Sequence, residues 1–291
     1  FNNVKLGIAP IGWTNDDMPQ LGGELTEQMV SEAALAGFQG TEVGGKFPTD
    51  PAVLNKHSTF AAQDRVPVVL QLPVLHAVRG ERKAFIKQLD FLEAVGASRI
   101  NVCELTRCLF AEECSMFGDN KPIATDEEWD KPCDGLNKLG KIAADRGFKL
   151  CFHHHMATVV QTFEETKRLM DNTDPRYVYL CFDTALTFSK EDAVKAAKEF
   201  GPRIGHVHLK DIRPDMMEGI CEGFKFRKAV LEGCFTIPGD GCVDYPGVFK
   251  ALHDAHYEGW FIVEAEQDPA KANPLEYAKM AREYIKKTAG I

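Results

Sequence analysis

Eight short β-rich runs alternate with longer amphipathic stretches along the 291-residue chain, and this alternation is the strongest constraint on its fold. The runs are residues 4–9, 40–43, 68–72, 99–104, 149–153, 177–183, 204–209 and 260–264. Strands that alternate with helices form a parallel sheet, because parallel neighbours need a crossover connection. Eight such units, without a composition break or a GxGxxG after the first run, favour an α/β fold of the closed (β/α)8 TIM barrel type over an open doubly wound sheet.

The amphipathic stretches predict the helices between these strands. They cover residues 25–36, 81–95, 126–146, 163–172, 192–199, 245–256 and 274–287, with a weaker candidate at 52–64. A glycine follows four of the stretches, at the position of a helix C-terminal cap. These glycines are Gly37, Gly96, Gly147 and Gly201.

The chain reads as a single TIM barrel domain over residues 1–291, because no low-complexity linker divides it. Its length suits one barrel of this type, which needs roughly 250 residues. The longest connection runs from residue 210 to residue 241. A connection of that size is usually functional in a compact domain, so we expect it to lie near the barrel mouth.

Composition excludes several classes of protein. The formal net charge is -9 and no dense Lys/Arg cluster occurs, which disfavours nucleic-acid binding. No apolar run reaches the roughly 18 residues of a membrane span, and the first residues do not form a signal peptide. Nine cysteines without a CxxC pair are typical of reduced, mostly buried thiols. We therefore expect a cytoplasmic protein without a membrane partner.

Histidines and carboxylates gather at the ends of the last four predicted strands, where the active sites of such barrels lie. Residues 153–155 (HHH) end the fifth strand, Asp183 ends the sixth, residues 206–208 (HVH) lie in the seventh, and Glu264 ends the eighth. Alternation along a strand places residues 153 and 155 on one face, and likewise 206 and 208. Two imidazoles and two carboxylates that converge would suit Mn²⁺ or Co²⁺, with Zn²⁺ as a further option, better than Ca²⁺.

Polar and aromatic groups near the ends of the first four strands would suit a hydroxylated ligand. Trp13, Glu42, Gln71 and Glu104 occupy these positions. Trp13 has an equal alternative as a packing residue, and Glu104 as an ion-pair partner. We expect Trp13, Glu42 and Gln71 to contact the substrate together with His206, the first histidine of the seventh strand.

These segments resemble the xylose-isomerase-like barrel superfamily, and within it the inosose dehydratase family. The superfamily elements are residues 182–184 (FDT), 206–211 (HVHLKD), 237–245 (IPGDGCVDY) and 263–264 (VE). The narrower match rests on residues 7–17 (GIAPIGWTNDD), 40–42 (GTE), 153–156 (HHHM), 233–241 (GCFTIPGDG) and 261–267 (FIVEAEQ). The resemblance spans essentially the whole chain.

The resemblance implies a metal site and a reaction. By position, the metal ligands of the superfamily fall on His153, Asp183, His208 and Glu264. Two departures from its common pattern stand out: His153 replaces the usual Glu, and Leu186 replaces a His that often touches the substrate. The family reaction removes water from 2-keto-myo-inositol (scyllo-inosose), a polyhydroxylated cyclic ketone, and gives a trihydroxycyclohexane-dione. The family also implies glutathione as a cofactor and, by analogy with related barrels, a homo-oligomer.

The implied reaction needs a general base for the α-proton and a general acid for the leaving hydroxyl. His155 and Lys210 are the candidates, because each lies one or two residues beyond a ligand position. Glu104 and Glu42 are substitutes. Lys210 would need a lowered pKa to act as the base but no shift to act as an acid. A structural ion pair is the equal alternative for Lys210.

Three other functions compete with dehydration. A ketose epimerase or isomerase on the same barrel would use the same metal, although His153 and Leu186 argue against it. An endonuclease for abasic DNA shares the superfamily but needs a basic groove that this acidic chain lacks. A non-catalytic sugar-binding barrel is favoured only by Leu186.

Overall fold

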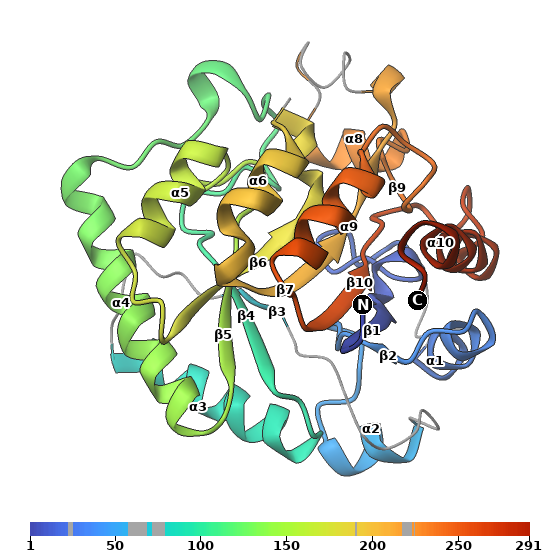
Figure 1. Ribbon diagram of the computed structural model, residues 1–291, viewed down its shortest axis with the longest axis horizontal. Helices are drawn as coiled ribbons and strands as arrows, with labels where there is room; N and C mark the ends of the chain where they lie inside the picture. The colour runs from blue at the N-terminus through green and yellow to red at the C-terminus, as the bar shows by residue number, and fades with distance from the viewer. Residues whose placement is uncertain (23–25, 58–68, 72–78, 190, 217–222, 224) are drawn as a thin grey trace.

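The computed structural model describes residues 1–22, 26–57, 69–71, 79–189, 191–216, 223 and 225–291. Eight parallel strands curl into a barrel, and helices surround it (Figure 1). The hydrogen-bonded order is β2-β1-β10-β7-β6-β5-β4-β3. Within the described segments no ladder joins the two end strands, β2 and β3. The predicted (β/α)8 barrel is confirmed.

The barrel strands lie where the β-rich runs predicted them, with ends that differ by one or two residues. They are β1 (Val4–Ile8), β2 (Gly40–Thr41), β3 (Val69–Gln71), β4 (Arg99–Cys103), β5 (Lys149–His153), β6 (Val178–Asp183), β7 (Ile204–Leu209) and β10 (Gly259–Val263). The central strands are buried on both faces, because helices cover the outside and side chains fill the inside. Residues 68 and 72 of the predicted third strand lie outside the described residues.

The predicted helices are also present. They are α1 (Thr26–Leu35), α2 (Pro51–His57), α3 (Arg79–Ala94), α4 (Asp126–Asp145), α5 (Phe163–Asp171), α6 (Ala193–Phe200), α9 (Tyr245–Asp254) and α10 (Pro274–Ala289). The weak candidate at 52–64 is α2 as far as His57, and its remainder lies outside the described residues, as does Leu25. Thr125 and Thr162 are the N-caps of α4 and α5, and each forms a capping box. The threonine hydroxyl accepts the backbone N–H of the Glu three residues later, and the side chain of that Glu accepts the backbone N–H of the threonine.

Three of the four predicted cap glycines have the left-handed backbone that this position favours. The φ angles are 91° at Gly37, 76° at Gly96 and 79° at Gly147. Gly201 is also the C-cap of its helix, α6, but its φ of -40° is right-handed, and it begins the 3-10 turn Gly201–Arg203 that precedes β7.

The connection 210–241 carries secondary structure of its own. A short ribbon pairs β8 (Asp211–Ile212) with β9 (Phe235–Thr236), and α8 (Phe226–Leu231) lies between them in the chain. The buried Asp211 carboxylate accepts backbone N–H groups of Ile212, Gly239 and Val243, which fastens both ends of the connection. Figure 1 shows α8 and β9 beside the upper part of the barrel.

A second hydrophobic cluster joins this connection to the loops after β1, β4 and β5. Its largest side chains are Met18, Phe110, Met116, Met156, Phe226 and Phe235. The rings of Phe110 and Phe226 stack at 4.8 Å between centroids. Because Phe110 also lines the cavity described below, α8 supports one wall of that cavity from behind.

Candidate metal centre and active site

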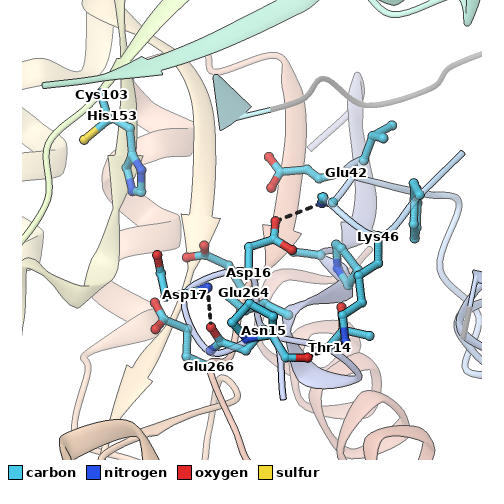
Figure 2. Close-up of a pocket in the computed structure, with 18 of the residues that line it drawn as sticks. Thr14, Asn15, Asp16, Asp17, Glu42, Lys46, Cys103, His153, Glu264 and Glu266 are labelled. Carbon is cyan, nitrogen blue, oxygen red and sulfur yellow. Dashed lines mark hydrogen bonds between the residues drawn. The ribbon is translucent and has the colours of Figure 1, made fainter. Parts of the chain in front are cut away.

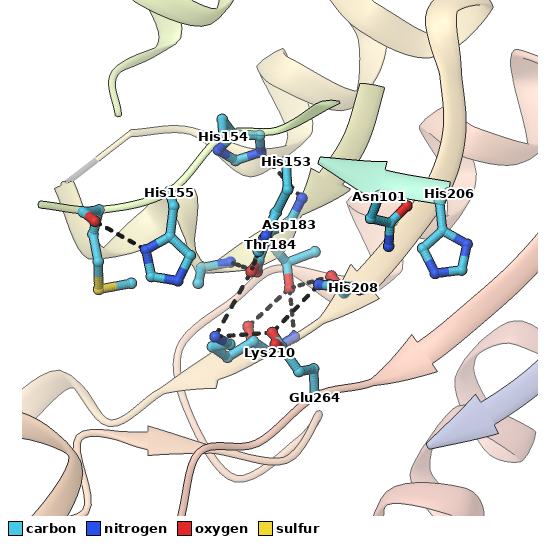
Figure 3. A network of polar contacts seen from close by, with 12 residues as sticks. Asn101, His153, His154, His155, Asp183, Thr184, His206, His208, Lys210 and Glu264 are labelled. Carbon is cyan, nitrogen blue, oxygen red and sulfur yellow. Dashed lines mark hydrogen bonds and ion pairs between the residues drawn. The ribbon is translucent and has the colours of Figure 1, made fainter. Parts of the chain in front are cut away.

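Four residues from four adjacent strands meet at the carboxyl ends of β5, β6, β7 and β10. His153 ends β5, Asp183 ends β6, His208 lies one residue before the end of β7, and Glu264 directly follows β10. Pairing places Asp183 opposite His208, and His208 opposite Ile262, so the four side chains lie at a similar level. Figure 3 shows how His153, Asp183, His208 and Glu264 converge. This juxtaposition agrees with the ligand set that the resemblance implies.

The spacing of these side chains fits a single divalent cation. His153 Nε2 lies 3.2 Å from Asp183 Oδ2, and His208 Nδ1 lies 3.4 Å from Glu264 Oε2. Two N/O donors that bind one cation at about 2.1 Å are themselves about 3.0–3.4 Å apart. His208 Nδ1 is buried and makes no hydrogen bond within the described residues, and Glu264 Oε2 lies 2.9 Å from the Lys210 ammonium. A buried ring nitrogen without a hydrogen bond needs a partner, so the residues present fit a metal ion.

Glu42 lies behind this group and holds two histidines at once. Its Oε1 atom accepts hydrogen bonds from His206 Nε2 and His208 Nε2, each at 2.9 Å, and from Asn101 Nδ2 at 3.3 Å. Burial raises the pKa of Glu42, but the neighbouring His208 and His206 outweigh it and lower the pKa to about 2. Glu42 is therefore an ionised carboxylate that only accepts protons in hydrogen bonds.

Lys210 is fully buried among three carboxylates. Its Nζ lies 2.7 Å from Glu266 Oε1, 2.9 Å from Glu264 Oε2 and 3.8 Å from Asp183 Oδ2. Burial lowers the pKa of Lys210, yet Glu264, Glu266 and Asp183 together raise it well above its usual value. The ammonium group therefore stays charged, which suits a proton donor or electrostatic group better than a base.

His155 presents one ring nitrogen to the cavity. Its Nδ1 lies 2.9 Å from the carbonyl oxygen of Met156, which can only accept, so the proton lies on Nδ1 and Nε2 keeps its lone pair. The ring lies 4.6 Å from that of Phe110 and 5.2 Å from that of His153. Burial, aided by His153 and Lys210, lowers the pKa of His155 to about 3, so the ring is neutral at physiological pH.

A cavity of about 830 Å³ opens above these groups. His153, Glu42, Glu264 and Glu266 contribute to its wall (Figure 2). His155 lines it as well. That volume is within the usual range for small-molecule sites. The polar wall and the buried charges suit a ligand rich in hydroxyl groups rather than an apolar one.

Several polar residues at the cavity were not predicted as site residues. Four of them follow the first and last strands of the barrel: Asn15, Asp16, Asp17 and Glu266. Glu266 bonds Lys210, and burial together with Glu264 raises its pKa to about 7. Asp17 lies beside Glu266 in Figure 2, and burial raises its pKa as well. Position alone could have indicated all four, because they follow the first and last strands of the barrel.

Several predicted site residues do not reach the cavity wall. Trp13 is buried in the main core and donates its indole N–H to Glu32 Oε2 at 2.6 Å, which agrees with the packing alternative. Glu104 turns back to accept the backbone N–H and hydroxyl of Thr106, rather than pairing with a Lys or Arg. His206 and Lys210 are fully buried behind the wall. The Gln71 side chain lies outside the described part of the structure, although its backbone ends β3.

Leu186 and the cysteines take structural positions. Leu186, in the 3-10 helix Thr184–Ser189, is buried in the main core and is not part of the cavity wall. None of the eight cysteines that the structure describes forms a disulfide, and five of these are buried. Across the described helices, none is long and apolar enough to cross a membrane.

Comparisons with known proteins agree with this geometry. The sequence model of the xylose isomerase-like TIM barrel family matches residues 30–288. An inosose dehydratase from Geobacillus thermodenitrificans is 49% identical over 294 residues, which cover 100% of this chain and 99% of the relative. One from Clostridium perfringens is also 49% identical, over 296 residues and 100% of both chains.

Solved structures show the same fold at much lower sequence identity. The IOLI protein with a bound zinc atom superimposes with a TM-score of 0.70 at 15% identity, over 98% of both chains. At this identity the likeness concerns the fold alone. The family assignment rests on the full-length identity to the curated relatives: this chain belongs to the inosose dehydratase family of xylose isomerase-like TIM barrels.

Proposed function

We propose that this protein is a metal-dependent hydro-lyase that removes water from 2-keto-myo-inositol and gives a trihydroxycyclohexane-dione in inositol catabolism. The observation that carries the proposal is its 49% identity, over the full length, to proteins named inosose dehydratase. The grouping of Asp183, His208 and Glu264, with His153 Nε2 3.2 Å from Asp183 Oδ2, supports it, because the reaction needs a cation at the ketone.

The donor set favours a borderline divalent metal. Two imidazole nitrogens and two carboxylates suit Mn²⁺, Co²⁺ and Zn²⁺, and the zinc in the IOLI structure is consistent with this range. When bound, such a cation supplies Lewis-acid stabilisation of the negative charge that develops on a ketone oxygen. Glutathione dependence and a homo-oligomeric state stay predictions from the family resemblance, and a cytoplasmic location stays a prediction from composition.

We propose that His155 takes the α-proton of the ketone. Its ring lines the cavity, and because Nδ1 donates to the Met156 carbonyl, the lone pair lies on Nε2. The neutral ring can therefore accept a proton without first losing one. The His153 ring, which would help to hold the cation, lies 5.2 Å from the His155 ring. A ketone bound at that cation would have its reacting carbon near His155.

The second proton transfer, to the leaving hydroxyl, belongs to the opposite side of the cavity. We propose the Lys210–Glu266 pair as the proton source, because Glu266 lines the cavity and bonds the Lys210 ammonium at 2.7 Å behind it. A proton given by Glu266 can be replaced from Lys210 Nζ along this contact. Glu104 and Glu42 are less suited, since Glu104 does not line the cavity and Glu42 stays ionised.

Replacing His155 by Asn should separate base catalysis from structure. The Asn amide can still donate to the Met156 carbonyl, in place of Nδ1–H, but it offers no atom at the Nε2 position. We expect kcat to fall at least about a hundredfold, the usual range for a lost general base. Metal affinity, measured by calorimetry, should stay at the wild-type value. Wild-type turnover by the variant would remove His155 from the mechanism.

A ketose or inosose epimerase is the second candidate, favoured by the fold of a D-psicose 3-epimerase, which superimposes with a TM-score of 0.71 at 17% identity, over 99% of this chain and 100% of that one. An epimerase would use the same proton abstraction but return the proton to the other face. It would need no proton source for a leaving hydroxyl. Return of a proton to the other face also needs a donor there, so the Lys210–Glu266 pair could serve either reaction. The 49% full-length identity to inosose dehydratases is what favours dehydration.

A turnover assay distinguishes the two reactions. Metal-stripped protein is given scyllo-inosose with and without Mn²⁺ or Co²⁺, and the product is followed by absorbance and mass. We expect metal-dependent loss of one water and formation of an absorbing dione. Unchanged mass with altered stereochemistry would make the protein an epimerase. Binding without turnover, with metal supplied, would make it a sugar-binding barrel.

A further inference from the structure

One carboxylate oxygen determines which nitrogen of His208 is available to a metal. Glu42 directly follows β2, and its side chain crosses to β7, where Oε1 lies 2.9 Å from both His206 Nε2 and His208 Nε2. Asn101 Nδ2, which can only donate, bonds the same oxygen, so Oε1 is an acceptor here and each ring presents a proton on Nε2. His208 Nδ1 is then the nitrogen left to bind a cation.

The second ring nitrogen of His208, Nδ1, faces the proposed metal group. Nδ1 lies 3.4 Å from Glu264 Oε2, in the group that also includes Asp183. It is fully buried and has no hydrogen-bond partner in the described structure. Had the proton been on Nδ1, the same ring would present an N–H to the metal group and could not bind a cation there.

We infer that Glu42 is a positioning residue for the metal centre: it sets the tautomer and the orientation of His208, so that Nδ1 serves as a ligand. The inference rests on the metal site of the proposed function. A carboxylate that accepts the second N–H of a metal-bound imidazole is a common support in metalloproteins. His206 and Asn101 complete it here, because they bond the same oxygen and fix the carboxylate in the barrel interior.

The wild-type protein gives the first test. In Zn²⁺-loaded protein with ¹⁵N-labelled histidine, NMR should show one zinc-bound ring that coordinates through Nδ1 and keeps its proton on Nε2. His153 should differ, since its Nε2 is the atom beside Asp183. A spectrum in which every zinc-bound ring coordinates through Nε2 would overturn the inference without any variant.

Two variants of Glu42 separate positioning from charge. Glu42→Asp keeps the negative charge but shortens the reach to His208, whereas Glu42→Gln keeps the reach and removes the charge. If Glu42 positions His208, both should weaken Co²⁺ binding about 10–100-fold in calorimetry, the usual effect of losing such a partner. Wild-type Co²⁺ affinity in Glu42→Asp would show that Glu42 acts only through its charge and does not position His208, which would overturn the inference.

Glu32→Gln is the matched control. Glu32 also accepts an N–H from a buried ring, that of Trp13, but it lies outside the metal group. We expect its Co²⁺ affinity to equal that of the wild type. If wild-type protein fails to bind Co²⁺ or Zn²⁺ at all, the metal site of the proposed function is wrong, and this inference falls with it.

Discussion

Replacing Asp183 by Ala should abolish turnover together with metal retention. Asp183 is buried, and its Oδ2 lies 3.2 Å from His153 Nε2 and 3.8 Å from Lys210 Nζ. Its loss removes one of two carboxylates that would face the cation, so kcat/KM should fall more than about a thousandfold, as for other lost electrostatic groups in active sites. Metal content measured by elemental analysis should drop in parallel with turnover of scyllo-inosose.

The control for this variant is Asp254→Ala, which removes an exposed carboxylate that pairs with Lys250 on α9. It should keep both metal and activity. Asp183→Asn retains the side-chain shape and its contact with the backbone N–H of Ala185, so it tests charge alone. Full activity in a metal-free Asp183→Ala protein would rule out the proposed mechanism.

Replacing Lys210 by Met should destabilise the metal-free protein strongly. The Lys210 ammonium lies 2.7 Å from Glu266 and 2.9 Å from Glu264, and all three side chains are buried. Its removal leaves two buried carboxylates without a counter-charge, which costs about 3–5 kcal/mol in comparable cases. Urea unfolding should report this as a lower midpoint, with turnover lost as well if Lys210 supplies the proton.

The pH and metal dependence of this variant should reveal the cause. Without the ammonium the pKa values of Glu264 and Glu266 rise in the folded protein, so its stability deficit should shrink as the pH falls and both become neutral. Saturating Mn²⁺ or Co²⁺ should recover part of the loss, because a cation restores positive charge beside Glu264.

Lys250→Met is the surface control, since it breaks an exposed ion pair four residues apart on one helix. Its free energy of unfolding should change by less than about 0.5 kcal/mol. A metal-free Lys210→Met protein as stable as the wild type would show that the buried charges are balanced in some other way.

The strand periodicity was the most informative part of the sequence. Regular alternation of β-rich and amphipathic runs predicted the parallel barrel, because only a limited set of topologies buries eight such units. It also placed His153, Asp183, His208 and Glu264 at one end of the barrel, since parallel strands all end at the same side. In the structure Asp183, His208 and Glu264 form one group, and His153 contacts Asp183; their role as ligands stays a prediction.

Side-chain direction was harder to predict than strand position. Trp13, Glu104 and His206 occupy the expected strand ends, yet none of them lines the cavity. Trp13 turns to Glu32 on α1, and Glu104 turns to the loop that follows it. Irregular backbone after a strand breaks the alternation of faces, so a period of two no longer says where the side chain points.

The sequence by itself determined the barrel, its strand order and the level at which metal-ligating side chains occur, because these follow from local periodicity and chain connectivity. Only the tertiary structure decided how the charges are paired: that Lys210 lies among Glu264, Glu266 and Asp183, and that Glu42 from β2 accepts from His208 on β7. These partners are far apart in the chain. Electrostatic pairing depends on distances of a few ångströms and on how deeply the charged groups are buried. Closure of the barrel alone creates those distances, and no local pattern in the sequence encodes them.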